Sequence, residues 1–85
     1  MITAAQLRAS RALLGIDQRQ LASLAGVSLP TVQRMEACDG TVRGMVDSLT
    51  KILGALDAAG IDLIAENAPS PGGGRGVRLR TPKPA

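Results

Sequence analysis

Glycines divide the first 60 residues of this chain into short segments, and no other feature limits the fold as strongly. Gly15, Gly26 and Gly60 each follow a run of residues that favours a helix, and Gly40 lies in a turn-like stretch at residues 38–41. Glycine commonly ends a helix because it adopts the left-handed backbone conformation without steric cost. The spacing therefore predicts four short helices before the hairpin-like end of the chain.

The first two predicted helices have clear start signals. The first covers residues 3–14 and opens with Thr3, a residue type that favours the N-cap position. The second follows Asp17, and Gln20 three positions later completes the pattern of a capping box. In the first helix, three- and four-residue spacing places Arg11 on a face that is otherwise apolar. Because a half-buried guanidinium without a partner is costly, Arg11 predicts an acidic partner elsewhere in the chain.

The third and fourth predicted helices have less distinct starts. The third covers about residues 29–37. Its N-cap is either Ser28 or Leu29, because Pro30 in the first turn pushes the preceding residue away from helical dihedral angles. The fourth and longest helix carries an apolar stripe within residues 45–60 and ends at Gly60.

After residue 60 the hydrophobic period changes from that of a helix to that of a strand. Apolar and charged residues alternate over residues 61–66 and again over 77–80, which predicts two short strands. Residues 67–74 between them are rich in turn formers, so the strands are expected to close an antiparallel hairpin. The predicted fold class is mainly α, with a four-helix domain over 1–60, a β-hairpin over 61–80 and a frayed tail over 81–85.

The composition excludes several kinds of chemistry. The chain has no His and no aromatic residue, so imidazole catalysis, histidine metal sites and base stacking on rings are absent. A single cysteine, Cys38, cannot form an intramolecular disulfide. The 7 carboxylates are scattered, so no enzymatic activity, cofactor or metal is expected. No secretory signal and no apolar stretch near the roughly 18 residues that span a bilayer is present, so we expect a cytoplasmic protein without membrane association.

Two short helices joined by a turn that contains glycine are the components of a helix-turn-helix. Counting from Gln18, Ala22 is small where the two helices approach, and Gly26 lies in the turn. Val32 and Met35 then provide the apolar anchors of the next helix. This combination of spacings is more specific than the presence of two helices alone.

Residues 18–36 resemble the lambda-repressor-like (Xre/Cro-type) helix-turn-helix family, and the resemblance extends back through Arg11 and forward to about Ala59. In that family an arginine near the end of the first helix pairs with a glutamate at the end of the recognition helix. The resemblance therefore implies a structural ion pair between Arg11 and Glu36. It also implies that Gln18, at the start of the second helix, contacts a DNA phosphate.

Placing Val32 and Met35 toward the core turns the opposite face of the third helix outward. A B-DNA major groove admits a helix, where Arg suits guanine, Gln suits adenine and apolar groups suit the thymine methyl. Arg34 and Gln33 are therefore the predicted base-reading residues, and the alternative for each is a solvated helix surface. Weaker apolar base contacts are predicted for Leu29, Pro30 and Thr31.

Contacts to the DNA backbone are predicted around this surface. Lys and Arg total 10 against 7 Asp and Glu, and the resulting net charge of +3 permits nucleic-acid binding without requiring it. The predicted phosphate contacts are Gln18, Ser28, Thr41 and Arg43. For Arg43 the alternative is a solvated position at the start of the fourth helix.

Specific recognition usually needs a two-fold dimer that reads half-sites about 34 Å apart. A lone two-stranded hairpin is marginally stable, and its apolar face and open edge gain from pairing with a second copy. The predicted dimerisation residues are Ile61, Leu63, Val77 and Leu79.

Three arginines of the hairpin, Arg75, Arg78 and Arg80, admit two interpretations. They form either a basic arm on DNA phosphates or a cross-strand charge match to Asp62 and Glu66. The charge match is favoured for Arg78 and Arg80.

These features predict a homodimeric, sequence-specific transcriptional regulator that inserts its third helix into the major groove of double-stranded DNA. The alternative is an antitoxin-like or protein-interaction module. Such a module would bind a partner protein, such as a toxin or RNA polymerase, through the C-terminal segment and would bind DNA secondarily.

Overall fold

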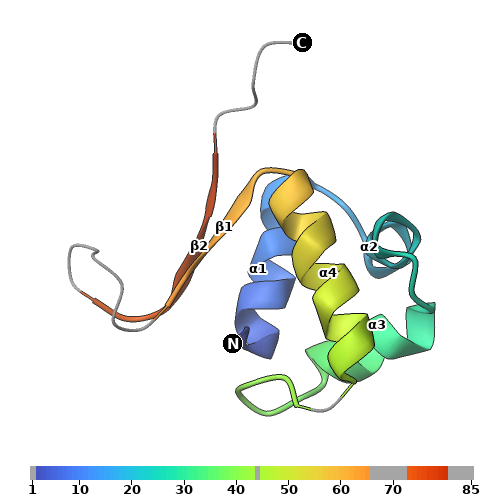
Figure 1. The fold of residues 1–85 in the computed structure, drawn as a ribbon. Helices are drawn as coiled ribbons and strands as arrows, with labels where there is room; N and C mark the ends of the chain where they lie inside the picture. The colour runs from blue at the N-terminus through green and yellow to red at the C-terminus, as the bar shows by residue number, and fades with distance from the viewer. Residues whose placement is uncertain (1, 44, 66–72, 81–85) are drawn as a thin grey trace, which may run out of the picture.

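The computed structural model describes residues 2–43, 45–65 and 73–80. Within these ranges the chain forms four helices followed by a two-stranded antiparallel sheet, which confirms the predicted fold class (Figure 1). The elements are α1 (Ala4–Leu14), α2 (Gln18–Ala25), α3 (Leu29–Glu36), α4 (Val46–Ala58), β1 (Ile61–Ile64) and β2 (Gly76–Leu79). Most of the predicted loop at 67–74 and the predicted tail at 81–85 lie outside the described residues.

Helices α1 and α2 begin and end where local signals place them. Thr3 and Asp17 are the N-caps, and each exchanges hydrogen bonds with a glutamine three residues later, which completes two capping boxes. Gly15 and Gly26 follow the two helices with φ of 68° and 71°, the left-handed conformation that favours glycine. The bounds of both helices therefore follow from signals within one turn of each end.

The structure decides between the two possible N-caps of α3. Ser28 is the N-cap, and its side-chain oxygen accepts a hydrogen bond from the N–H of Thr31. Helix α4 begins one residue later than its apolar stripe suggests, because Met45 lies before the helix with a φ of 50°. Met45 makes no side-chain cap hydrogen bond, so the start of α4 has no local signal of the kind that marks the other helices.

Aliphatic side chains from the four helices and β1 form a single core. α2 and α3 lie on one side of α4, and the hairpin lies on the other (Figure 1). The largest fully buried side chains are Ile2, Leu7, Leu21, Val32, Met35, Val42, Ile52 and Leu56. The core therefore fixes α3 by Val32 and Met35, the two anchors that the sequence places inward.

The loop that follows α3 is held by the start of the chain. An isolated antiparallel bridge joins Thr3 to Thr41. Main-chain hydrogen bonds of 2.9 and 3.0 Å flank this bridge and join segment 2–4 to segment 40–42. Val42 is fully buried in the same region. The path of the loop is thus set by main-chain pairing as well as by the core.

The hairpin pairs Ile61 with Leu79 and Leu63 with Val77. These four side chains share one face of the sheet, because directly opposite and alternate residues lie on the same side. Ile61 is 2 % exposed and belongs to the core of its own chain, and Val77 packs against that core. Part of the apolar face of the hairpin, at Ile61 and Val77, therefore docks the hairpin on its own domain.

Candidate nucleic-acid interface

Helices α2 and α3 are joined by a short turn at residues 26–28 and pack against each other. The turn closes on α2, where the N–H of Val27 donates to the carbonyl of Ala22 at 3.0 Å. Ala22 is buried, as its small side chain predicts for a place where two helices approach closely. The two helices and the turn thus have the geometry of a helix-turn-helix.

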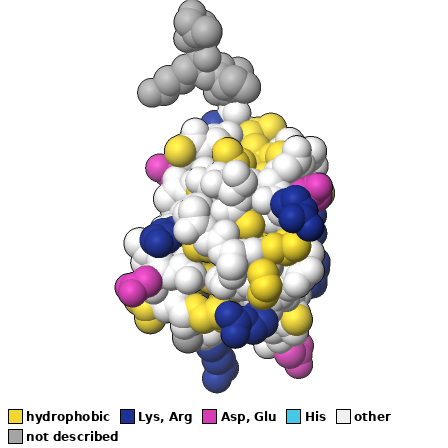
Figure 2. All heavy atoms as spheres, turned by 90° about the vertical axis from the view of Figure 1, so that its right-hand side faces the viewer, with side chains coloured by type: hydrophobic (Ala, Val, Ile, Leu, Met, Phe, Trp, Pro, Cys, Tyr) yellow, Lys and Arg dark blue, Asp and Glu magenta, His cyan; other side chains and the backbone are white. Residues whose placement is uncertain are grey.

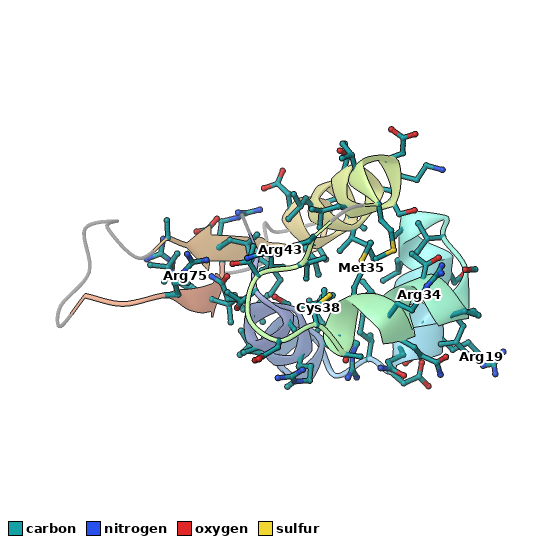
Figure 3. All side chains as sticks on the ribbon, turned by 90° about the horizontal axis from the view of Figure 1, so that it is seen from below. Arg19, Arg34, Met35, Cys38, Arg43 and Arg75 are labelled. Atoms are coloured by element: carbon teal, nitrogen blue, oxygen red, sulfur yellow. The ribbon has the colours of Figure 1, made fainter. Side chains whose placement is uncertain are left out.

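The outward face of α3 carries most of the residues that were predicted to contact bases. Val32 and Met35 are fully buried, while Pro30, Gln33 and Arg34 on the other side are exposed. Figure 3 shows Met35 directed into the interior and Arg34 at the surface. An exposed helix face that includes an arginine and a glutamine offers the donors and acceptors that base edges in a major groove require.

Two residues at the start of α3 are less accessible than the helical spacing predicts. Leu29 is half-buried, and Thr31 is only 8 % exposed. The Thr31 Oγ1 lies 2.8 Å from the Oγ of Ser28, so the hydroxyl is bonded within the N-terminal cap of the helix. The exposed part of α3 is therefore narrower than the predicted surface and is centred on Gln33 and Arg34.

An ion pair holds the end of α3 to α1. The Nε and Nη2 of Arg11 donate to the two carboxylate oxygens of Glu36 at 2.6 and 2.8 Å, in the bidentate geometry that suits a guanidinium. The hydrogen bond to Glu36 is the largest cause that raises the pKa of Arg11. Only 4 % of the Glu36 side chain is exposed. The acidic partner that Arg11 requires is thus present, at the residue that the family resemblance indicates.

Two further donors complete this cluster, and one of them has no counterpart in the sequence analysis. The Nε2 of Gln18 donates to Glu36 Oε1 at 3.2 Å, and the Nη1 of Arg8 donates to the main-chain carbonyl of Glu36 at 2.6 Å. Arg8 precedes Arg11 by three residues, so the two side chains lie on one side of α1. This spacing is the signal that identifies Arg8 as a second support of α3.

The predicted phosphate-contact residues surround α3 but differ in availability. The Gln18 amide is bonded to Glu36, and the Ser28 hydroxyl caps α3. Thr41 is half-buried in its bridge with Thr3. Arg43 is exposed. Of these four residues, Arg43 has the side chain best placed to reach an external anion.

Arginines from three elements lie on the side of the molecule that α3 occupies. Figure 3 shows Arg19 from α2, Arg34 from α3 and Arg43 from the following loop, with Arg43 nearest the hairpin. In Figure 2, Lys or Arg side chains reach the lower end of the face shown, where α3 lies in Figure 1. Exposed arginines of this kind attract phosphate.

The predicted dimerisation residues fall into two groups. Ile61 and Val77 are occupied by the core of their own chain, whereas Leu63 and Leu79 are 37 % and 38 % exposed. Only the second pair retains surface for an external partner. The hairpin alternation correctly identifies an apolar face, but the domain itself covers half of it.

Ion pairs engage Arg78 and Arg80 of the hairpin. Arg78 lies directly opposite Asp62, and its Nη2 donates to Asp62 Oδ2 at 3.0 Å. Arg80 bonds Asp62 and also reaches Asp57 at the end of α4. Arg78 and then Arg80 hold the pKa of Asp62 below its ordinary value. The cross-strand charge match is therefore present for Asp62, while Glu66 lies outside the described residues.

Other sites have little support in the described part of the chain. No group of three His, Cys, Asp or Glu side chains there is arranged to hold a metal ion. Among the same residues, no helix has the length and apolar character needed to cross a membrane. Cys38 is half-buried, and its Sγ donates to the carbonyl of Arg34 at 3.5 Å.

A compact set of helices in which α3 is anchored by its inner face and presents a polar outer face defines a helix-turn-helix domain, a class that binds DNA. The sequence model of the family described as "Helix-turn-helix domain" matches residues 3–63, and the chain belongs to this family. The match runs from the N-cap of α1 into β1 and is consistent with the lambda-repressor-like resemblance. No curated protein matches the chain significantly.

Proposed function

We propose that this protein is a sequence-specific transcriptional regulator that binds double-stranded DNA with α3 in the major groove. The observation that carries the proposal is that α3 exposes Gln33 and Arg34 on its outer face while its inner face is packed in the core. Val32 and Met35 anchor α3 in the core, and the Arg11–Glu36 pair fixes its end. A helix held in this way presents its outer side chains at defined positions, as base reading requires.

Arg34 and Gln33 are the proposed base-reading residues. Arg34 is suited to the O6 and N7 of guanine and Gln33 to the N6 and N7 of adenine, while Pro30 and the exposed part of Leu29 are suited to thymine methyl groups. Arg43 is the principal proposed phosphate contact, because its exposed side chain extends from the loop that follows α3.

We further propose that the protein acts as a homodimer, since one domain of this size contacts only one half-site. Leu63 and Leu79, with the open edge of the hairpin, supply the surface for the second copy. The same surface suits the alternative function, in which the C-terminal segment binds a partner protein such as a toxin and DNA binding is secondary. Size measurement of the purified protein, alone and with DNA, tests the proposed homodimer, and a protein that stays monomeric on DNA would favour the alternative.

Selection of bound sequences from random double-stranded DNA tests the main proposal. The wild-type protein is expected to enrich one motif with two-fold symmetry, with affinity that falls as salt rises at a log–log slope on the order of −5 for about six neutralised phosphates. Arg34→Ala should cost roughly 1 to 3 kcal/mol and relax the preference at one base pair, while Arg43→Ala should weaken binding to all sequences alike. Lys51→Ala, which removes one exposed charge from α4, is the matched control. An equal loss on every sequence from Arg34→Ala would contradict base reading.

A further inference from the structure

Gln6 links three parts of the molecule that are distant in the sequence. It is 5 % exposed, and its side-chain amide is fully used. The Oε1 accepts from the N–H and Oγ1 of Thr3 at 2.9 and 3.3 Å. The Nε2 donates to the carbonyls of Ile64 at 3.1 Å and Gly76 at 3.0 Å, one from each strand of the hairpin. One buried amide thus joins the start of α1 to both β1 and β2.

The capping box of α1 does not require these bonds to the hairpin. In the capping box of α2, Gln20 stands at the equivalent position, and its Oε1 accepts from the N–H of Asp17 at 2.9 Å on an exposed surface. A carboxylate serves this purpose equally well, since a capping box needs only an acceptor. The two donations from Gln6 therefore serve the attachment of the hairpin rather than the start of the helix.

The other end of this link is the loop that carries the proposed phosphate contact. Thr3, whose N–H and hydroxyl both donate to the Gln6 side chain, pairs with Thr41 in the isolated bridge. The flanking main-chain bonds fix residues 40–42, and Arg43 follows directly. Hydrogen bonds thus join the hairpin to Gln6 and Gln6 to Thr3. On either side of Thr3, the N–H of Ala4 donates to the carbonyl of Gly40, and the carbonyl of Ile2 accepts from the N–H of Val42, next to Arg43.

We propose that Gln6 is a positioning residue for DNA binding, whose buried amide couples the docking of the hairpin to the position of the Arg43 loop. The proposal rests on the proposed function, in which Arg43 contacts a phosphate. Gln6 itself touches no DNA. When its two donations are lost, Ile61 and Val77 still pack the hairpin against the core, but no Gln6 hydrogen bond holds the hairpin to the start of α1. The loop paired with segment 2–4 is then held less firmly. The phosphate contact weakens. Base reading by α3 is retained, because the donors to Glu36, namely Arg8, Arg11 and Gln18, still hold the end of this helix.

The test compares Gln6→Glu with Gln20→Glu in the full chain. Both substitutions replace an amide by a carboxylate at the third position of a capping box and add the same charge, but only Gln6→Glu removes donors to the hairpin. Gln6→Met adds no charge but also loses the Oε1 acceptor of the capping box, so Gln20→Met, which loses only that acceptor, is its matched control. We expect Gln6→Glu and Gln6→Met to weaken DNA binding about tenfold, as for the loss of one charge-assisted hydrogen bond, with the salt slope reduced by about 1 and the selected motif unchanged.

A double-mutant cycle with Arg43→Ala distinguishes positioning from general damage. If Gln6 acts through the loop, Gln6→Met should cause little further loss once Arg43 is absent. A substitution that only unfolds part of the protein population lowers affinity without changing the salt slope, and its effect persists in the Arg43→Ala background. Persistence of the loss, or affinity for Gln6→Met within twofold of the wild type, overturns the proposal.

Amide NMR shifts of the free protein test the same link without DNA. We expect Gln6→Met to move the amide signals of Thr41 and Arg43, and Gln20→Met to leave them in place. If the wild-type protein fails to bind DNA, the proposed function is wrong and the coupling is judged by these signals alone. If it binds DNA and these signals stay in place, Gln6 is not a positioning residue although the proposed function stands.

Discussion

Substitution of Arg11 tests how much the ion pair between Arg11 and Glu36 contributes to the free energy of unfolding. The Glu36 carboxylate receives two hydrogen bonds from Arg11 and one from Gln18, and its side chain is 4 % exposed. Arg11→Met leaves this charge with a single neutral donor. Breaking a buried pair by removing one partner costs about 3 to 5 kcal/mol, and because the Arg11 side chain is 21 % exposed we expect about 3 kcal/mol.

The matched variant removes both charges. In Arg11→Met/Glu36→Leu no carboxylate remains to be buried without a partner, so the double variant should be more stable than Arg11→Met by about 1 to 3 kcal/mol.

Urea denaturation followed by far-ultraviolet circular dichroism measures these differences, because a domain of this size is expected to unfold in one cooperative step. We expect Arg11→Met to be the least stable of the three proteins at neutral pH. A cost below about 1 kcal/mol for Arg11→Met, or a double variant no more stable than Arg11→Met, would show that the carboxylate is reached by water and that the pair adds little.

Two further predictions concern the hairpin and the helix ends. Arg78 and Arg80 lower the pKa of Asp62, so Asp62 stabilises the hairpin above the ordinary range of Asp pKa values and this contribution is lost as the pH falls through the lowered value. The protection factors of the amides in β1 and β2, which correct for the intrinsic pH dependence of exchange, should therefore fall in the wild type on acidification below about pH 4, and those of Asp62→Asn should show a flatter pH dependence. Gly26→Ala should destabilise the protein by about 1 kcal/mol because of the left-handed φ of 71°, although no atom lies within 4 Å of the added Cβ. Gly54 lies within α4 and also has no atom within 4 Å of an added Cβ, so Gly54→Ala should stabilise the protein by about 0.5 to 1 kcal/mol. In thermal unfolding, the midpoint temperature should fall for Gly26→Ala and rise for Gly54→Ala.

The elements that the sequence predicts best are those with signals inside a single turn. Thr3 with Gln6 and Asp17 with Gln20 define the starts of α1 and α2, because a capping box involves residues only three positions apart. The start of α4 lacks such a signal. Met45 adopts a left-handed conformation that its residue type does not favour, so it is the surrounding structure that holds it there.

The sequence predicts the part of the candidate site that lies on α3 alone. The period of α3 places Val32 and Met35 inward and Arg34 outward, which the structure reproduces. The period alone does not show that Thr31 is covered, because its hydroxyl turns back to the N-cap.

Contacts between elements were not predictable from local pattern. The hairpin alternation indicates an apolar face, yet whether that face meets a second copy or the chain's own core depends on where the hairpin docks. Ile61 is buried in its own domain, and Gln6 bonds both strands across 58 and 70 residues. Arg11 required a carboxylate, but the identity of Glu36 came from the family resemblance rather than from spacing.

The shortness of α3 makes its supports as important as its own sequence. A helix of eight residues is not stable in isolation, so the orientation of its outer face is set by the core and by the two arginines of α1 that end on Glu36. Substitution of the exposed Arg34 should therefore leave stability within about 0.5 kcal/mol of the wild type while it changes DNA preference. Loss of Arg8 or Arg11 should do the opposite, lowering stability and general affinity together. The base-reading surface and its support are thus separate sets of residues, and mutations in the two sets should be distinguishable by measuring both quantities.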